Sequence, residues 1–170
     1  MNIPIWSDIM CPFCYIGKKH LEAALAQVGL KEKVTIQWKS FQLDPTLDSK
    51  AQPMTTQQYL IQKKGMCVEQ YKQVFERLVM MGKEAGIDFA QSGAFIVNTW
   101  KAHKLMHLAK KHNKQSEMKV LLFEAHFISG KNVAHEDVVV SIAALLHIAE
   151  REVRDALSDK IFLIRGNKIS

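Results

Sequence analysis

Two cysteines separated by two residues, Cys11 and Cys14, are the side chains of this chain best suited to covalent chemistry. Thiols at this spacing can join as a disulfide and separate again. They follow a short apolar segment, residues 3–6, and stand at the start of a segment with helical character. A sulfur at a helix start lies at the positive end of the helix dipole, which favours the thiolate. The sequence therefore predicts a redox-active dithiol in which the pKa of Cys11 is lowered.

The residues around the pair predict a βαβ unit. Residues 3–9 alternate as in a strand, and the segment from Pro12 to about Val28 has helical spacing. Pro12 suits the first helical turn, where no backbone N–H is missed. Residues 34–38 alternate again and predict a second strand parallel to the first. A CxxC pair in this context is typical of a redox motif, and a structural zinc site would need two further ligands.

The remainder of the chain is predicted to be mostly helical. Residues 44–54 hold two prolines and two aspartates and are typical of a linker. The final residues, 160–170, break the helical pattern and predict either a short strand or a frayed terminus. Helix start and stop signals predict helices over about 55–65, 68–85, 98–113, 114–129, from 135 onward and over 151–157.

Composition and charge limit the classes of function. The chain has 170 residues, of which 48% are apolar and 24% charged, as in soluble globular proteins. No apolar run approaches the roughly 20 residues of a membrane-spanning helix. The net charge is +6, but the lysines are dispersed, so we expect no nucleic-acid partner. Because a secretory signal pattern is missing and three cysteines are too few for a disulfide scaffold, we expect a cytoplasmic protein without a membrane partner.

Three stretches of the sequence resemble the DsbA branch of the thioredoxin superfamily, and most closely its cytoplasmic FrnE-like oxidoreductases. They are residues 7–18 around Cys-Pro-Phe-Cys, residues 98–105, which have the family form NTxxAHxL, and residues 122–130. The resemblance implies an α/β, thioredoxin-like fold of the DsbA type with a large all-helical insertion domain.

The same resemblance implies domain boundaries. The thioredoxin-like βαβ unit with the CxxC pair is expected over 1–44, the helical insertion over 45–158, and a tail over 159–170. In the family a third strand, entered through a cis-proline, follows the insertion, whereas no proline follows Pro53 here. We therefore expect the thioredoxin half to be incomplete, with the tail as a remnant of the third strand.

The implied activity is that of a protein dithiol–disulfide oxidoreductase or isomerase. Cys11 is expected to attack and Cys14 to resolve the mixed disulfide, with Pro12 and Phe13 completing the motif. No cofactor is implied beyond the redox-active disulfide Cys11–Cys14, although the resemblance allows glutathione as a small-molecule thiol. The expected partners are protein or peptide thiols and disulfides. The third cysteine, Cys67, is expected to be a bystander.

The helix with the NTxxAHxL pattern supplies further candidates. The resemblance implies that it faces the groove beside the thiols, so Asn98, Trp100 and His103 are expected to line that groove. A half-buried histidine, hydrogen-bonded for structure, is the alternative for His103. His103 and His107 stand four residues apart, but without a third ligand in familiar spacing we expect no metal site.

Two other functions remain open. The glutathione-dependent isomerases of hydroxychromene carboxylates and the kappa glutathione transferases belong to the same superfamily, but they place a serine where Cys11 stands, so redox chemistry is preferred. A non-catalytic remnant that serves as a binding or dimerising module is the other alternative. Without further strands the outer edge of the first strand would be unpaired, which favours a homodimer or strand exchange.

Overall fold

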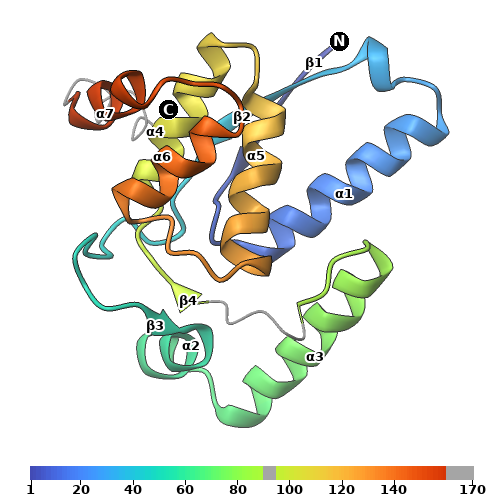
Figure 1. Cartoon of the computed structure of the whole chain (residues 1–170). Coiled ribbons are helices and arrows are strands. Elements are labelled where there is room, and N and C mark those ends of the chain that lie inside the picture. The colour runs from blue at the N-terminus through green and yellow to red at the C-terminus, as the bar shows by residue number, and fades with distance from the viewer. Residues whose placement is uncertain (90–94, 160–170) are drawn as a thin grey trace.

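A computed structural model describes residues 1–89 and 95–159 of the chain, and the fold is α/β (Figure 1). Within these residues no helix is both long and apolar enough to cross a membrane. The elements in chain order are β1 (Asn2–Ser7), α1 (Pro12–Gln27), the 3₁₀ helix η1 (Lys31–Lys33), β2 (Thr35–Ser40), β3 (Met54–Thr55), α2 (Thr56–Lys64), α3 (Val68–Glu84), β4 (Phe95–Ile96), α4 (Trp100–Lys111), α5 (Gln115–Phe123), the π-helix η2 (Glu124–Ile128), α6 (Glu136–Ala144) and α7 (Glu150–Ser158).

Strands β1 and β2 form the predicted parallel pair, joined through α1. Ile3 stands opposite Ile36, and Ile5 stands opposite Trp38. In the described part of the chain this sheet has two strands, so no third strand pairs with β1 there. The strand predicted within residues 160–170 lies outside the described residues.

The far edge of β2 is closed by a side chain of α5. The amide of Gln115 accepts a hydrogen bond from the Trp38 backbone N–H at 3.1 Å and donates to the Trp38 carbonyl at 3.2 Å. This pairing imitates one rung of a β-ladder and satisfies both backbone groups of Trp38 in a buried position. It also fixes α5 against the sheet.

Local signals in the sequence determine where the helices begin and end. Pro12 occupies the first turn of α1, and Gly29, with φ +65°, follows its last turn. Thr55 and Gln58 form a capping box at the start of α2, which ends at Gly65 with φ +70°. The third cysteine, Cys67, is exposed and caps α3 by accepting a hydrogen bond from the Gln70 N–H at 3.5 Å.

One prediction about the segment 45–158 is wrong, because the segment is not all helical. Met54 pairs with Ile96 and Thr55 with Phe95 in a short antiparallel ladder that joins β3 to β4. Each strand has two residues, which is too short for a two-residue alternation to stand out in the sequence. Figure 1 shows that this ladder lies next to α2, between α2 and the helices α4 and α6.

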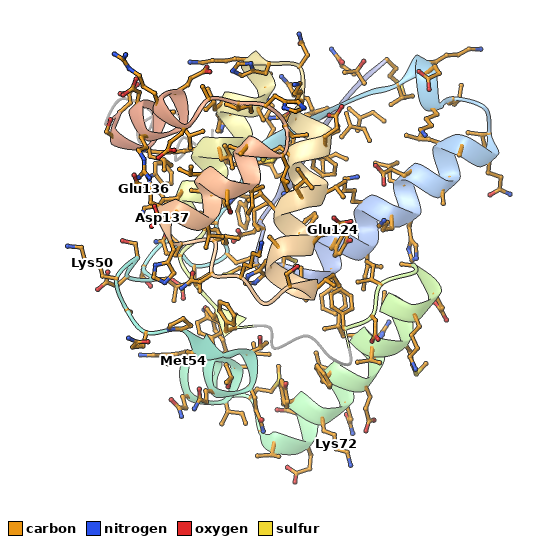
Figure 2. The ribbon with its side chains drawn as sticks, in the orientation of Figure 1. Lys50, Met54, Lys72, Glu124, Glu136 and Asp137 are labelled. Atoms are coloured by element: carbon orange, nitrogen blue, oxygen red, sulfur yellow. The ribbon has the colours of Figure 1, made fainter. Side chains whose placement is uncertain are left out.

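Two apolar cores hold the elements together. The larger joins the sheet to α4, α5, α6 and α7, and the smaller joins α1 to α3, α5 and η2. The smaller core is aromatic: the Tyr15 ring stacks on Phe123 at 4.8 Å between ring centroids, and Phe89 meets Phe127 edge to face at 5.5 Å. Glu124 caps the end of α5 and lies beside α1 in Figure 2, where these two helices meet. The start of α1 therefore rests on a rigid aromatic base.

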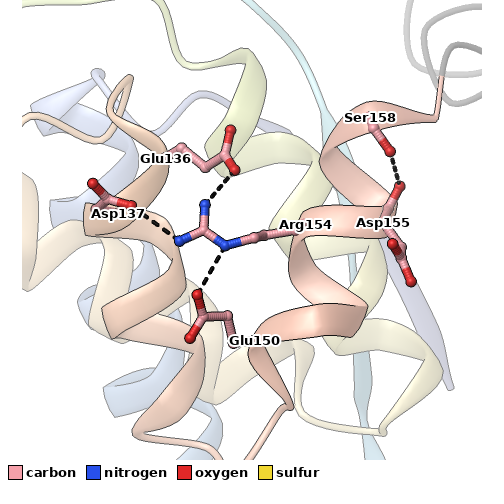
Figure 3. A network of polar contacts seen from close by, with 6 residues as sticks. All are labelled: Glu136, Asp137, Glu150, Arg154, Asp155 and Ser158. Atoms are coloured by element: carbon pink, nitrogen blue, oxygen red, sulfur yellow. Dashed lines mark hydrogen bonds and ion pairs between the residues drawn. The ribbon is translucent and has the colours of Figure 1, made fainter.

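A charge network fixes α7 to α6 on the surface. The Arg154 guanidinium contacts Glu136 at 2.6 Å, Asp137 at 3.2 Å and Glu150 at 2.8 Å (Figure 3). Exposed ion pairs of this kind contribute little to stability, because water and salt screen them. The network therefore orients α7 more than it stabilises the fold.

Helix α3 depends on a glycine at its contact with the aromatic core. A Cβ at position 82 would overlap the Phe89 ring and would lie 2.9 Å from the Ile87 carbonyl oxygen. We expect Gly82→Ala to lower the free energy of unfolding by about 1–3 kcal/mol through overpacking, despite the better helix propensity of alanine. Urea denaturation measures this change.

The control is Gly17→Ala in α1, where an added Cβ meets nothing within 4 Å. This substitution should leave stability unchanged or raise it by up to about 1 kcal/mol. Equal effects of the two substitutions would contradict the proposed packing of Phe89 on α3.

Candidate active site

The two cysteines of the CxxC motif lie together at the start of α1 as free thiols. Cys11 is the N-cap residue of the helix, and the Cys14 backbone N–H donates to the Cys11 carbonyl at 3.1 Å. Both side chains are half-buried, and their thiols form a hydrogen bond with each other. The structure therefore brings together the two predicted catalytic residues, in the reduced form and with similar exposure.

This thiol–thiol hydrogen bond divides the charge of the pair unequally. It stabilises a thiolate on Cys14 and, together with the Ser7 hydroxyl, the Asp8 backbone and the charge of Lys119, lowers the pKa of Cys14 to about 6, although burial opposes the shift. The same hydrogen bond, together with burial and the Cys14 charge, raises the pKa of Cys11. The hydrogen bond therefore favours ionisation of one thiol of the pair and disfavours ionisation of the other. The prediction that Cys11 would have the lowered pKa is not met in this arrangement, because Cys11 is the donor.

The motif is flanked by exposed aromatic side chains and by two cavities. Trp6 is 57% exposed and Phe13 is 45% exposed. On one side, a cavity of about 280 Å³ lies beside Pro12. Its walls include Tyr71 and Phe75 of α3.

The second cavity, of about 210 Å³, lies on the β1 side of the motif. Cys14 lines it together with Trp38 of β2 and Lys18 of α1. Cys11 is not among its lining residues. Each sulfur therefore has a different environment, although the two side chains are similarly exposed.

A buried carboxylate holds the loop before Cys11 in place. Asp8 is 1% exposed and accepts hydrogen bonds from the Thr99 hydroxyl at 2.7 Å and the Leu43 backbone N–H at 2.7 Å, with His103 Nε2 at 3.2 Å. Burial acts to raise the pKa of Asp8, but the bonds with His103, Leu43 and Thr99 outweigh it and lower that pKa. This one side chain connects the catalytic loop, the chain after β2 and the start of α4.

The three groove candidates have different positions. His103 is 2% exposed and is held by Asp8, in keeping with the structural alternative. Asn98 is half-buried: its amide donates to the Leu47 carbonyl at 2.6 Å and accepts from the Trp100 N–H at 2.8 Å. Trp100 is also half-buried. None of these three residues lines either cavity beside the thiols.

Three buried lysines surround this region, and two of them have clear polar partners. Lys18 pairs with Glu22 one turn along α1, and Lys104 donates to the carbonyls of Leu157 and Asp159. Lys119 of α5 is 1% exposed, and burial lowers its pKa to about 8. In the described residues no hydrogen bond or ion pair of its ammonium is found, and the ammonium lies over the rings of Trp38 and Phe123.

Sequence reasoning identified the thiols but missed their supports. Asp8 and Thr99 lie inside stretches that resemble the family, yet their pairing spans 91 residues and no spacing rule predicts it. Lys119 stands in a helical segment where a lysine is ordinarily solvated. In the described part of the chain, no three His, Cys, Asp or Glu side chains are grouped to hold a metal ion.

Comparison with known proteins identifies the family. The profile of the DSBA-like thioredoxin domain matches residues 2–162. A probable DsbA oxidoreductase from Streptomyces coelicolor is 28% identical, and its crystal structure superposes with a TM-score of 0.87 over 98% of this chain and 71% of that chain.

Two further proteins are more distant. The uncharacterised protein YwbO of Bacillus subtilis (strain 168) is 23% identical over 164 residues, which cover 95% of this chain and 74% of that protein. The cytosolic disulfide reductase DsbM from Pseudomonas aeruginosa is 15% identical with a TM-score of 0.60, over 96% of this chain and 74% of that chain, and so shares the fold.

The Asp8 network predicts a specific dependence of stability on pH. We expect Asp8→Asn to lower the free energy of unfolding by about 1–3 kcal/mol, because a hydrogen-bonded buried anion is lost. The folded pKa of Asp8 is lowered. Its contribution is therefore complete above the unfolded pKa of about 3.9 and disappears as pH falls through the folded pKa. Urea titrations of wild type and variant at several pH values should converge in acid.

Asp155→Asn is the control, since this carboxylate is exposed and lies 3.9 Å from Arg151 on the surface. It should change stability by no more than about 1 kcal/mol. If Asp8→Asn cost no more than this control, the Asp8 network would not hold the loop as described.

Proposed function

The chain belongs to the DsbA-like thioredoxin domain family, and we propose that it is a dithiol–disulfide oxidoreductase with Cys11 and Cys14 as its redox pair. The observation that carries this proposal is the hydrogen-bonded pair of free thiols at the start of α1. A negative charge held by the hydrogen-bonded pair becomes the thiolate that disulfide exchange requires when the Cys11 proton moves to Cys14. Both the chemistry of the thiol pair and the family relationship therefore support the proposed activity.

In the reducing direction, the first step forms a mixed disulfide. The Cys11 proton passes to Cys14 along their hydrogen bond, and the Cys11 thiolate bonds to one sulfur of the substrate disulfide. The substrate S–S bond breaks, and its other sulfur leaves as a thiolate that is protonated by solvent. Cys11 suits this role because it stands at the helix start, beside exposed Phe13.

The second step resolves that intermediate. Cys14 gives up its proton to solvent and its thiolate attacks the Cys11 sulfur. The mixed S–S bond breaks, the Cys11–Cys14 disulfide forms, and the second substrate sulfur leaves as a thiolate that solvent protonates. Two electrons pass from the enzyme dithiol to the substrate, and the reverse sequence oxidises a substrate dithiol. No cofactor enters either step, and glutathione can act as the small-molecule thiol.

We propose protein or peptide disulfides and thiols as the substrates. The exposed ring of Phe13 within the motif, and that of Trp6 on β1, offer apolar contact to a substrate. The cavity beside Pro12 has aromatic walls and a volume of about 280 Å³, suited to an apolar side chain of a substrate. These features favour a polypeptide partner over a small polar one.

We further propose a cytoplasmic location and a place nearest the FrnE-like branch of the family. The supporting features are the Cys-Pro-Phe-Cys and NTxxAHxL stretches and the exposed free thiol of Cys67, which suits a reducing compartment. DsbM, which shares the fold, is described as a cytosolic disulfide reductase.

Reduction of insulin by dithiothreitol tests the activity. We expect wild type to accelerate insulin precipitation and Cys11→Ser to reduce the rate to the uncatalysed background, because no mixed disulfide can form through position 11. Cys67→Ser should keep the full rate, since Cys67 is exposed and serves only as the cap of α3. Equal rates for wild type and Cys11→Ser would show that the CxxC pair does not catalyse this exchange.

A further inference from the structure

Lys119 is a buried lysine of α5 that has no role in the two reaction steps proposed above. Its ammonium lies 4.7 Å from the Phe123 ring centroid and 5.4 Å from the Trp38 ring centroid. A buried lysine without a counter-ion is costly, because burial disfavours its charged form. We therefore expect a negatively charged group near Lys119 that offsets the cost of burying its charge.

The two rings that hold Lys119 also adjoin the catalytic thiols. Trp38 lines the same cavity of about 210 Å³ as Cys14. Phe123 stacks on Tyr15, the residue that follows Cys14 on α1. Lys119 therefore contacts two rings, Trp38 and Phe123, that each adjoin the segment of α1 carrying Cys14.

The charged groups around this ammonium favour Cys14 as its partner. Among the charges that act on Lys119, that of Cys14 is the strongest attraction, ahead of Asp8 and Cys11, while Lys18 repels it. The Asp8 oxygens are occupied by Thr99, Leu43 and His103, and no ion pair joins Asp8 to Lys119. Lys18 is neutralised by Glu22. The Cys14 sulfur is therefore the negative group best placed to balance Lys119.

We propose that Lys119 is a positioning residue for the redox reaction, whose positive charge stabilises the Cys14 thiolate during resolution of the mixed disulfide. This role rests on the proposed oxidoreductase function. Because a thiolate exists only in the reduced dithiol, Lys119 also favours the reduced form over the Cys11–Cys14 disulfide. Removal of its charge should make the protein easier to oxidise.

The thiolate pKa of Cys14 tests this role directly. In a Cys11→Ser, Cys67→Ser background, Cys14 is the one remaining thiol, and the ultraviolet absorbance of its thiolate reports its titration. We expect Lys119→Met to raise that pKa by about one unit or more. Methionine keeps the length of the side chain, so stability should be unchanged or higher when the buried charge is removed.

Lys104→Met is the matched control, because Lys104 is also buried but is bound to backbone carbonyls near α7. It should leave the Cys14 pKa unchanged, although it can lower stability. An unchanged pKa in Lys119→Met, with the fold intact by circular dichroism, would overturn the proposal. An equal rise of the Cys14 pKa in Lys119→Met and in Lys104→Met would indicate a general loss of structure and would also overturn the proposal.

A redox equilibrium with glutathione gives a second readout in the otherwise native chain. Lys119→Met should increase the equilibrium constant for oxidation about tenfold, which corresponds to about 30 mV. If Lys119→Met does not fold, NMR titration of the Lys119 side chain in wild type replaces the variant, and its pKa should be higher in the reduced protein than in the disulfide form. Equal values in the two forms would contradict the coupling.

These results separate the two proposals. A raised Cys14 pKa in a protein that does not reduce insulin would preserve the Lys119–Cys14 interaction and reject the oxidoreductase function. Insulin reduction with an unchanged Cys14 pKa would reject the role of Lys119 alone.

Discussion

The hydrogen bonds of the buried Asp8 carboxylate are the constraint on which the rest of the site depends. Asp8 stands three residues before Cys11, and its oxygens connect the catalytic loop to Leu43, Thr99 and His103. A buried anion with several donors tolerates little displacement, because each lost bond leaves an unsatisfied group. The position of the thiols is therefore fixed from the helical segment as well as from the sheet.

A second consequence concerns charge near the sulfurs. The site combines one fully bonded carboxylate, a hydrogen-bonded thiol pair and a lysine that pairs with no carboxylate of the described residues. Burial makes interactions among these groups stronger than they would be in water. The chain segments that pack the core also place charged groups near the dithiol, since α5 carries Lys119 and α4 carries His103, which binds Asp8. In this fold the helical segment contributes to the chemistry and not only to shape.

Much of the fold could be predicted from local signals in the sequence. The βαβ unit follows from alternation, Pro12 and Gly29, and the start of α2 follows from Thr55. The β3–β4 ladder could not be predicted, because two-residue strands have no periodicity to detect. Spacing identified Cys11 and Cys14, whereas the pKa order within the pair depends on which sulfur donates, a property of three-dimensional geometry.

The groove candidates illustrate the same limit. The NTxxAHxL pattern predicted residues that line a groove, whereas in the structure His103 is buried against Asp8 and Asn98 binds the chain at Leu47. A sequence pattern indicates that residues are important, but it does not show whether their side chains contact a substrate or stabilise the fold. The buried partners of a charge lie far apart in the chain, so only the structure identifies them.

The most direct test of the central claim is to trap the mixed disulfide with a peptide disulfide and identify it by mass spectrometry, in a background without Cys67. The account predicts that Cys14→Ala accumulates an adduct on Cys11, because the resolving thiol is absent, while Cys11→Ala accumulates little. An adduct found only on Cys14 in the Cys11→Ala protein, or none in either variant, would contradict it.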